Sequence, residues 1–414
     1  MAKYFLPGVL ALGLVNSSQT QETELSRYRK EPLKQQLQID NGIDVEIGLT
    51  GIYQQNARGS LSTHRRAGRN SGSYDLEISA DMEKILGMKN SSLFIHTEGF
   101  WSKSAGIDRS SVGSFFGVNG DVFPRETVVI TELWFEQAML DGKFLLRIGK
   151  MDLTGGFECS DWPVAFDVGA FANDETSQFL NSALVNNPTI PFPIYALGLA
   201  GYYNPVEWWY FSAGVVDAQN DLRETGFRTT FHGEDYFFYI FETGVMPVMD
   251  SSNGPLQGAY RVGLWNDPQP KAHSDAVKTY RDDVGFYLSC DQMLFKESSD
   301  DSDGQGLGAF ARYGYADGDK NDMTNFWSFG IQYQGLLDGR DEDVLGAGFA
   351  QGFFSNKASI TYTEDYESAF ELYYNAKVAP WLNISPSIQY ITNTGGSDLI
   401  GDSVIFGIRA QMLF

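Results

Sequence analysis

The sequence predicts an all-β fold, a transmembrane antiparallel β-barrel of about 16 strands with long extracellular loops and short periplasmic turns. Apolar and polar residues alternate along one segment after another, which is the pattern of strands with two different faces. The connections between these segments are alternately long and short. Aromatic residues make up 14% of the chain, yet no interior apolar run approaches the ~20 residues that a membrane helix needs.

Charge and cysteine content narrow the possible functions. The chain has 30 basic and 53 acidic residues and a formal net charge of −23, which argues against nucleic acid as a partner because phosphates are bound by clustered Lys and Arg. Two cysteines do not make a disulfide framework. No cofactor or metal is expected.

The N-terminal residues are expected to be processed. Lys3 precedes a short apolar run at 4–15, and Asn16-Ser17-Ser18 follows. This layout predicts a signal peptide at 1–18. A buried helix at the start of a soluble domain is the alternative, because the cleavage site lacks the usual small-x-small pattern. Residues 19–42 are then a periplasmic N-terminal segment, and residues 43–414 form the outer-membrane barrel.

Alternation along the rest of the chain assigns side chains to two faces. Tyr74 and Leu76 share one face of a strand, while Asp75 and Glu77 share the other. Strands are expected at 43–55, 73–82, 91–102, 128–139, 143–152, 196–204, 208–217, 235–246, 257–266, 283–296, 306–316, 325–336, 343–354, 366–379, 381–392 and 402–414. An even number is what a single-chain bacterial barrel requires in order to close.

Loop lengths support a barrel over its alternatives. The long connections are expected at 56–72, 103–127, 153–195, 218–234 and 267–282, and the short ones at 83–90, 140–142, 204–207 and 379–380. Asp141-Gly142 is a tight hairpin signal. A secreted soluble β-sandwich or β-solenoid would also alternate, but it would not predict this parity.

The most specific motifs lie near the C-terminus. Pro-Trp-Leu at 380–382 is followed by Pro-Ser-Ile-Gln-Tyr-Ile at 386–391, Asn-Thr-Gly-Gly at 393–396, Gly-Ile-Arg at 407–409 and a final Phe414. Glu-Gln at 136–137 precedes Arg-Ile-Gly-Lys-Met-Asp at 147–152. These motifs resemble the carbohydrate-selective porins, the OprB family, although Thr394 stands where proline is usual. The resemblance covers essentially the whole mature chain.

The resemblance implies a porin for passive diffusion of carbohydrates through a water-filled barrel, without enzymatic activity. It would reach the bacterial outer membrane after secretion to the periplasm. Its expected partners are mono- or oligosaccharides as permeants, outer-membrane lipid and lipopolysaccharide, the barrel-assembly machinery, and copies of itself if it is a homotrimer rather than a monomer. A non-selective general diffusion porin and an outer-membrane barrel enzyme are the alternatives.

Inward charges suggest a path for the permeant. Opposed arginines and carboxylates in a narrow lumen set a transverse field and offer hydrogen-bond partners to hydroxyl groups. The candidate pore-lining residues are Glu77, Glu98, Glu132, Trp134, Glu136, Arg147, Asp174, Glu175, Arg312, Glu371, Tyr373, Asn375, Gln389 and Arg409. For any single residue, filling a wet barrel interior is the competing interpretation.

The longest connection, 153–195, is the expected constriction loop, with Asp174, Glu175 and Phe179 as lining residues. An ordinary surface lid is its alternative. His96, two residues before Glu98, is interpreted as one of two polar lumen residues rather than as a catalytic base. The acidic loop 317–322 resembles a calcium loop but lacks the glycine and the distal glutamate of an EF-hand. Cys290 on the lipid face is not expected to bridge Cys159.

Overall fold

The structure is a computed structural model. It describes residues 42–101, 106–122, 127–154, 166–167, 179–221, 227–231, 233–272, 278–300, 303–358 and 361–414. The expected signal peptide, nearly all of the segment 19–42, and Asp174, Glu175 and Cys159 therefore lie outside the described residues. The rest of the chain carries the barrel.

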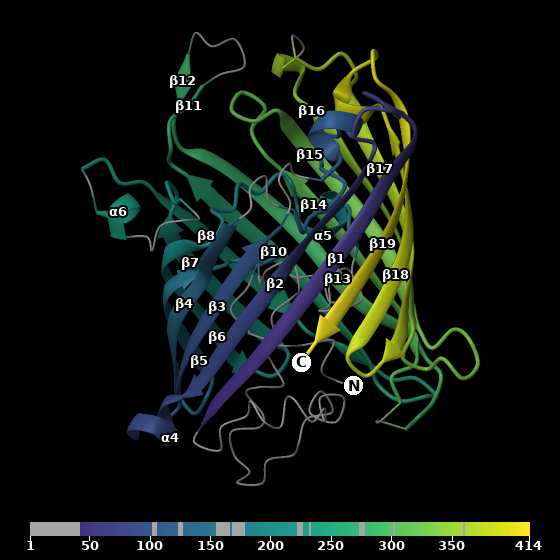
Figure 1. Cartoon of the computed structure of the whole chain (residues 1–414). Helices are drawn as coiled ribbons and strands as arrows, with labels where there is room; N and C mark the ends of the chain where they lie inside the picture. The colour runs from purple at the N-terminus through teal and green to yellow at the C-terminus, as the bar shows by residue number, and fades with distance from the viewer. Residues whose placement is uncertain are drawn as a thin grey trace.

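A closed antiparallel barrel is the main feature of the molecule (Figure 1). Its strands are β1 (Ile43–Ser60), β2 (Gly68–Asp81), β3 (Ser91–Phe100), β4 (Thr127–Met139), β5 (Phe144–Met151), β6 (Ala196–Val206), β7 (Trp209–Asp217), β8 (Phe237–Val245), β10 (Leu256–Asp267), β13 (Asp283–Lys296), β14 (Gly306–Tyr315), β15 (Met323–Gln334), β16 (Val344–Phe354), β17 (Tyr366–Ala379), β18 (Leu382–Thr392) and β19 (Gly401–Leu413). The predicted fold class is confirmed, and each barrel strand overlaps a predicted one.

The first and last strands seal the barrel. β1 pairs with β2 on one side and with β19 on the other, in a register that sets Gly48 opposite both Asp75 and Leu413. Ile47 and Phe414 exchange two backbone hydrogen bonds of 3.1 and 2.9 Å. No edge of the sheet is thereby left to face lipid, where unpaired backbone groups cannot be tolerated.

Shorter elements lie in the connections. They are α4 (Met82–Leu86), a π-helical turn η2 (Asp108–Val112), α5 (Ser182–Val185), α6 (Phe227–Thr230), β9 (Val248–Met249), which pairs with β10, the hairpin of β11 (Lys271–Ala272) and β12 (Thr279–Tyr280), and two 3-10 turns, η3 (Asn356–Ala358) and η4 (Thr394–Gly396). Among the described residues, no helix is both long and apolar enough to cross a membrane.

The short turns follow from local chemistry. The Asp81 carboxylate accepts hydrogen bonds from the amides of Glu83 and Lys84 and so caps α4, and Gly87 ends that helix with a φ of 72°. Leu140, Asp141 and Gly142 all adopt positive φ in the turn between β4 and β5. This geometry is the tight hairpin that Asp141-Gly142 predicted.

The β1–β2 hairpin is taller than expected. β1 continues to Ser60 and β2 begins at Gly68, whereas residues 56–72 were predicted to be a loop. The added residues, 56–60 and 68–72, are almost all polar or glycine and so show no apolar–polar alternation, and two register shifts interrupt the pairing of β1 with β19 between Asn56 and Ser60. Backbone pairing persists where the side-chain pattern does not.

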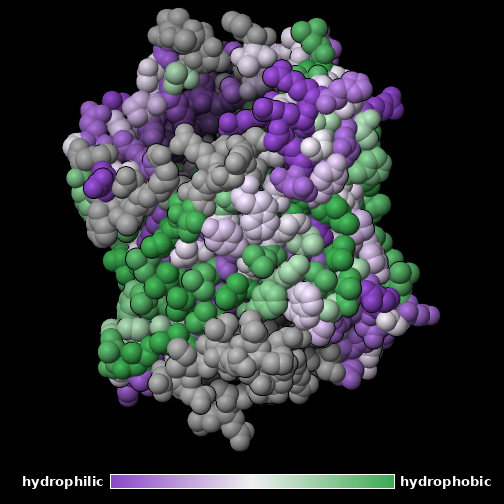
Figure 2. Space-filling model, viewed as in Figure 1, coloured by the Kyte–Doolittle hydropathy of each residue, from purple (hydrophilic) through white to green (hydrophobic). Residues whose placement is uncertain are grey.

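The two faces of the wall differ in polarity. Outward side chains such as Tyr53, Phe329 and Phe406 are about half exposed, and Figure 2 shows a hydrophobic band on the visible face with hydrophilic residues gathered toward its upper end. Inward side chains include many buried carboxylates, arginines and amides. An apolar exterior around a polar interior is the arrangement of an outer-membrane barrel.

Candidate functional site

The predicted lumen residues that the structure describes lie on the inner face of the wall. Glu77 is half-buried and the others are buried, and they form two groups. One group lies on β2 to β5 and contains Glu77, Glu98, Glu132, Trp134, Glu136 and Arg147. The other lies on β14, β17, β18 and β19 and contains Arg312, Glu371, Tyr373, Asn375, Gln389 and Arg409.

A stacked cation is the centre of the first group. The Arg147 guanidinium lies 3.8 Å from the Trp134 ring centroid, and its Nη2 is 2.9 Å from Glu136 Oε2. Trp134 Nε1 in turn donates to Glu132 Oε2 at 3.1 Å. Each polar end of the stack therefore has a charged or polar partner, which fixes the orientation of the ring and of the guanidinium.

Acidic side chains dominate the inner face beside this stack. His96 lies directly across the strands from Glu77 on one side and from Glu132 on the other. Its Nε2 is 3.2 Å from Asp75 Oδ1, so its hydrogen-bond partner is Asp75 and not the Glu98 that lies two residues on. Glu98 accepts a hydrogen bond from the Tyr195 hydroxyl at 3.1 Å.

The second group contacts a loop rather than a bare wall. Glu371 accepts backbone hydrogen bonds from Leu180 and Asn181. Arg312 donates to the backbone oxygen of Leu184 at 2.8 Å, and Gln389 accepts from the Asn181 side chain. The part of the β5–β6 connection at 179–190, which includes α5, therefore packs inside the barrel (Figure 1).

A second inward segment and its main acceptor were missed by the sequence analysis. Residues 106–122 of the β3–β4 connection also lie against the inner wall, where Glu367 accepts hydrogen bonds from Ser114, Phe115 and Phe116. Glu367 precedes Glu371 by four residues, so both carboxylates lie on the same face of β17. This spacing was the available signal.

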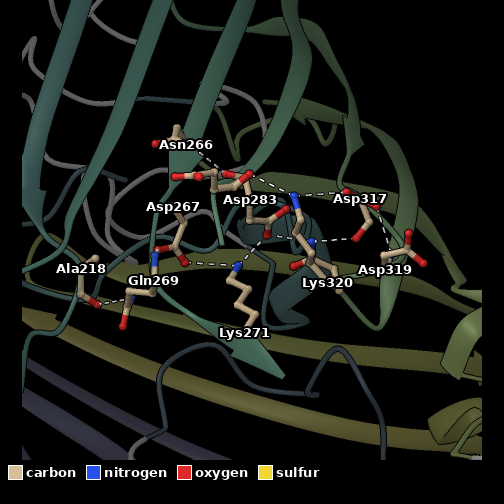
Figure 3. A network of polar contacts seen from close by, with 11 residues as sticks. Ala218, Asn266, Asp267, Gln269, Lys271, Asp283, Asp317, Asp319 and Lys320 are labelled. Atoms are coloured by element: carbon tan, nitrogen blue, oxygen red, sulfur yellow. Dashed lines mark hydrogen bonds and ion pairs between the residues drawn. The ribbon is translucent and has the colours of Figure 1, made fainter. Parts of the chain in front are cut away.

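Figure 3 shows a polar network in the long connections near β10 and β13. Lys271 Nζ lies 3.2 Å from Asp267 and 2.6 Å from Asp283. In the adjacent connection, Lys320 Nζ is 3.3 Å from Asp317, and Asn321 donates to Asp283 at 2.8 Å. Ion pairs and hydrogen bonds thus join two long connections of the barrel.

The calcium-like loop 317–322 supplies its own cation through Lys320. The backbone hydrogen bond from Asp319 lowers the pKa of Asp317 below its usual value, and the Lys320 ammonium acts in the same direction. Among the residues that the structure describes, no group of three or more His, Cys, Asp or Glu side chains could hold a metal ion. Cys290 is a free, half-buried thiol.

Comparison with known proteins adds to this geometry. A family model described as carbohydrate-selective porin, OprB family, matches residues 65–414. Porin B of Pseudomonas aeruginosa is 24% identical over 414 residues that cover 91% of this chain and 88% of that protein. Porin AaxA of Chlamydia abortus is 21% identical over 314 residues, which cover 75% of this chain and 63% of that protein.

Solved structures share the fold. The high-pH structure of Pseudomonas putida OprB matches with a TM-score of 0.77 and 20% identity, covering 91% of this chain and 95% of that one. Outer-membrane expressed OmpT of Vibrio cholerae matches with a TM-score of 0.52 and 12% identity, covering 91% and 99%. At such identities these two likenesses support the barrel architecture alone.

Proposed function

The chain belongs to the OprB family of carbohydrate-selective porins, and we propose that sugars cross its barrel along the inner face of β2, β3 and β4. The protein is a β-barrel porin of the bacterial outer membrane that passes carbohydrates. We propose that passage is passive and involves no catalytic step.

The observation that carries this path is the difference between the two parts of the inner wall. On β17 and β18, the carboxylate of Glu371 and the amide of Gln389 are occupied by loop atoms. On β2, Glu77 remains half-buried next to His96, whose side chain is 17% exposed. Carboxylates and imidazoles are suitable hydrogen-bond partners for sugar hydroxyls.

The stack of Trp134 and Arg147 lies on the same face and contacts its carboxylates. Because both residues are only 1% exposed, their role in the proposal is to hold Glu132 and Glu136 in place. Glu98 and Glu132 extend the same acidic face. The row of carboxylates would favour neutral sugars and cations over anions in a narrow lumen.

Further parts of the proposal concern the rest of the chain and its surroundings. We propose that 1–18 is a signal peptide, that 19–42 is periplasmic and that 153–195 narrows the lumen. Lipopolysaccharide, the barrel-assembly machinery and further copies of the chain in a homotrimer are proposed partners. Asp174 and Glu175 stay candidate lining residues.

Liposome swelling tests the proposed function. Purified protein is reconstituted, and swelling rates are compared for neutral mono- and disaccharides and for amino acids of similar size. Fast swelling with sugars and slow swelling with amino acids would support carbohydrate selectivity. A dependence on size alone would instead indicate a general diffusion porin, and no swelling would contradict both.

Glu77→Gln tests the path itself. Removing this carboxylate should lower the preference of the channel for cations, measured as a shift in reversal potential across a KCl gradient. Glu207→Gln in the exposed turn between β6 and β7 is the matched control. An unchanged reversal potential in the Glu77 variant would place the path elsewhere.

A further inference from the structure

Two loop segments meet inside the barrel and form one unit. Segment 106–122 comes from the β3–β4 connection, and segment 179–190 comes from the β5–β6 connection. The Ser182 amide donates to the Gly117 oxygen at 3.1 Å, and the Gly120 amide donates to the Leu180 oxygen at 2.8 Å. A displacement of one segment would therefore disturb the other.

Glu367 holds the first segment. Its side chain is fully buried and accepts from the Ser114 hydroxyl at 2.7 Å and from the amides of Phe115 and Phe116 at 2.9 and 3.1 Å. It also accepts from the Gly395 amide, which belongs to the connection between β18 and β19. One carboxylate thus joins three parts of the chain, because it can accept several hydrogen bonds at once.

Glu371 holds the second segment in the same way. It is also fully buried and accepts from the Leu180 amide at 2.9 Å and from the Asn181 amide at 2.8 Å. These two amides directly precede α5 and have no carbonyl partner within that short helix. The carboxylate therefore satisfies amides that would otherwise be buried without an acceptor.

Two amide side chains complete the attachment between these carboxylate contacts. Gln54 on β1 and Gln389 on β18 both donate to the Val118 oxygen, at 2.8 and 2.9 Å. Gln389 also accepts from the Asn181 side chain at 3.1 Å, so it touches both segments. The attachment extends across β17, β18, β19 and β1, which are neighbouring strands.

Apolar packing fixes the distance between the unit and the wall. Val118, Phe179 and Leu184 are buried in a cluster with wall residues that include Tyr373. A Cβ at Gly348 would lie 3.0 Å from both Phe179 and Leu184, so the absence of a side chain there lets the unit lie close to β16. The two-loop unit therefore occupies part of the lumen next to β16 and β17.

We propose that Glu367 and Glu371 are positioning residues that fix the two-loop unit to β17 and thereby set the upper size of solute that the channel passes. The inference rests on the proposed function for the identity of the solute. The attachment itself would be the same for any permeant. Neither carboxylate needs to touch the solute.

The test uses Glu367→Ala and Glu371→Ala, with Glu367→Gln and Glu371→Gln as milder variants. Each glutamine keeps one acceptor oxygen but presents an NH2 group to amide donors. Folded protein is identified by its heat-modifiable electrophoretic mobility. Single-channel conductance in KCl and the swelling rate for a trisaccharide relative to a monosaccharide are then measured, with Glu207→Gln as the control.

The alanine variants are expected to raise the ratio of the trisaccharide swelling rate to the monosaccharide swelling rate by about twofold or more. Their single-channel conductance should be higher than that of the wild type or should fluctuate between levels. A purely structural loss would reduce the number of folded channels and leave this ratio unchanged. Equal ratios and conductances in both folded alanine variants and the wild type would overturn the proposal.

If the alanine variants do not fold, amide hydrogen exchange in the glutamine variants tests whether the two carboxylates hold the loop segments. The amides of Leu180 and Asn181 should exchange faster in Glu371→Gln, and those of Phe115 and Phe116 should exchange faster in Glu367→Gln. Unchanged exchange at these amides would overturn the proposal. Wild-type channels that conduct KCl but pass no sugar would contradict the proposed function alone, since the KCl measurement still tests the two carboxylates.

Discussion

Replacing Arg147 with alanine is expected to destabilise the barrel strongly. The Arg147–Glu136 pair is buried, with 2% and 9% of the two side chains exposed. Loss of one partner leaves an uncompensated buried charge, which typically costs about 3–5 kcal/mol. The stack of the guanidinium on Trp134 at 3.8 Å is lost as well, and a desolvated contact of this kind contributes about 2 kcal/mol. Since the two contributions overlap, we expect a total of about 3–5 kcal/mol.

Reversible urea unfolding of the barrel in lipid vesicles, followed by tryptophan fluorescence, measures the free energy of unfolding. Arg147→Lys should recover part of the loss, because it restores the charge but not the planar stack or the fork of donors. Lys84→Ala is the control. The pair of Lys84 with Asp81 is 3.7 Å long and its side chains are 61% and 43% exposed, so it should contribute less than about 1 kcal/mol.

A loss below about 1 kcal/mol for Arg147→Ala would refute the reasoning, because the site would then behave like the exposed pair. The double variant with Glu136→Gln separates the two contributions. If the unpaired carboxylate is the main cost, adding Glu136→Gln to Arg147→Ala should restore stability. If the stack on Trp134 is the main contribution, the second substitution should have little effect.

Three further outcomes are expected. Gly263→Ala should destabilise the barrel by about 1–3 kcal/mol, because its Cβ would lie 2.0 Å from the Tyr287 ring, whereas Gly51→Ala, with no atom within 4 Å of its Cβ, should be nearly neutral in the same unfolding assay. Lys271→Met should accelerate amide exchange in the β10–β13 connection, since its two carboxylate partners would repel each other; unchanged exchange would show that the network of Figure 3 does not hold this connection. Calcium should not raise the melting temperature, because the loop 317–322 already carries a lysine at its acidic end, and a clear rise would reveal a cation site.

Alternation was sufficient to locate all sixteen barrel strands, although it missed the upper parts of β1 and β2. Each side chain of a strand points opposite to its neighbour, so Glu371 and Arg147 could be assigned to the interior from the pattern of polar residues alone. The alternation predicts which face of the strand a residue occupies, but not which loop segments pack against that face. Glu371 was therefore predicted to line the pore, while in the structure it binds backbone amides of the 179–190 segment.

Inward folding of the loops could not be predicted because it depends on contacts that are distant in sequence. Glu367 accepts a hydrogen bond from the Phe115 amide, although the two residues are separated by more than half of the sequence. The 106–122 segment has no periodic pattern from which this contact could be predicted. The same limit applies to His96, which was predicted only to be a polar lumen residue and whose partner Asp75 lies on the adjacent strand. Pairing register, rather than sequence distance, decides such partners.

Sealing of β1 against β19 has a consequence for how the chain reaches its native state. The strand that is synthesised first pairs with the strand that is synthesised last, since the register joins residues 48–60 to residues 401–413. Contacts between residues so far apart in sequence require a large loss of chain entropy before their favourable interactions form, and they therefore make folding slow. An incomplete barrel would keep two open edges in lipid. Insertion of the strands into the membrane and closure of the barrel are therefore expected to occur together, with pairing of the C-terminal strand β19 to β1 as the step that closes the barrel.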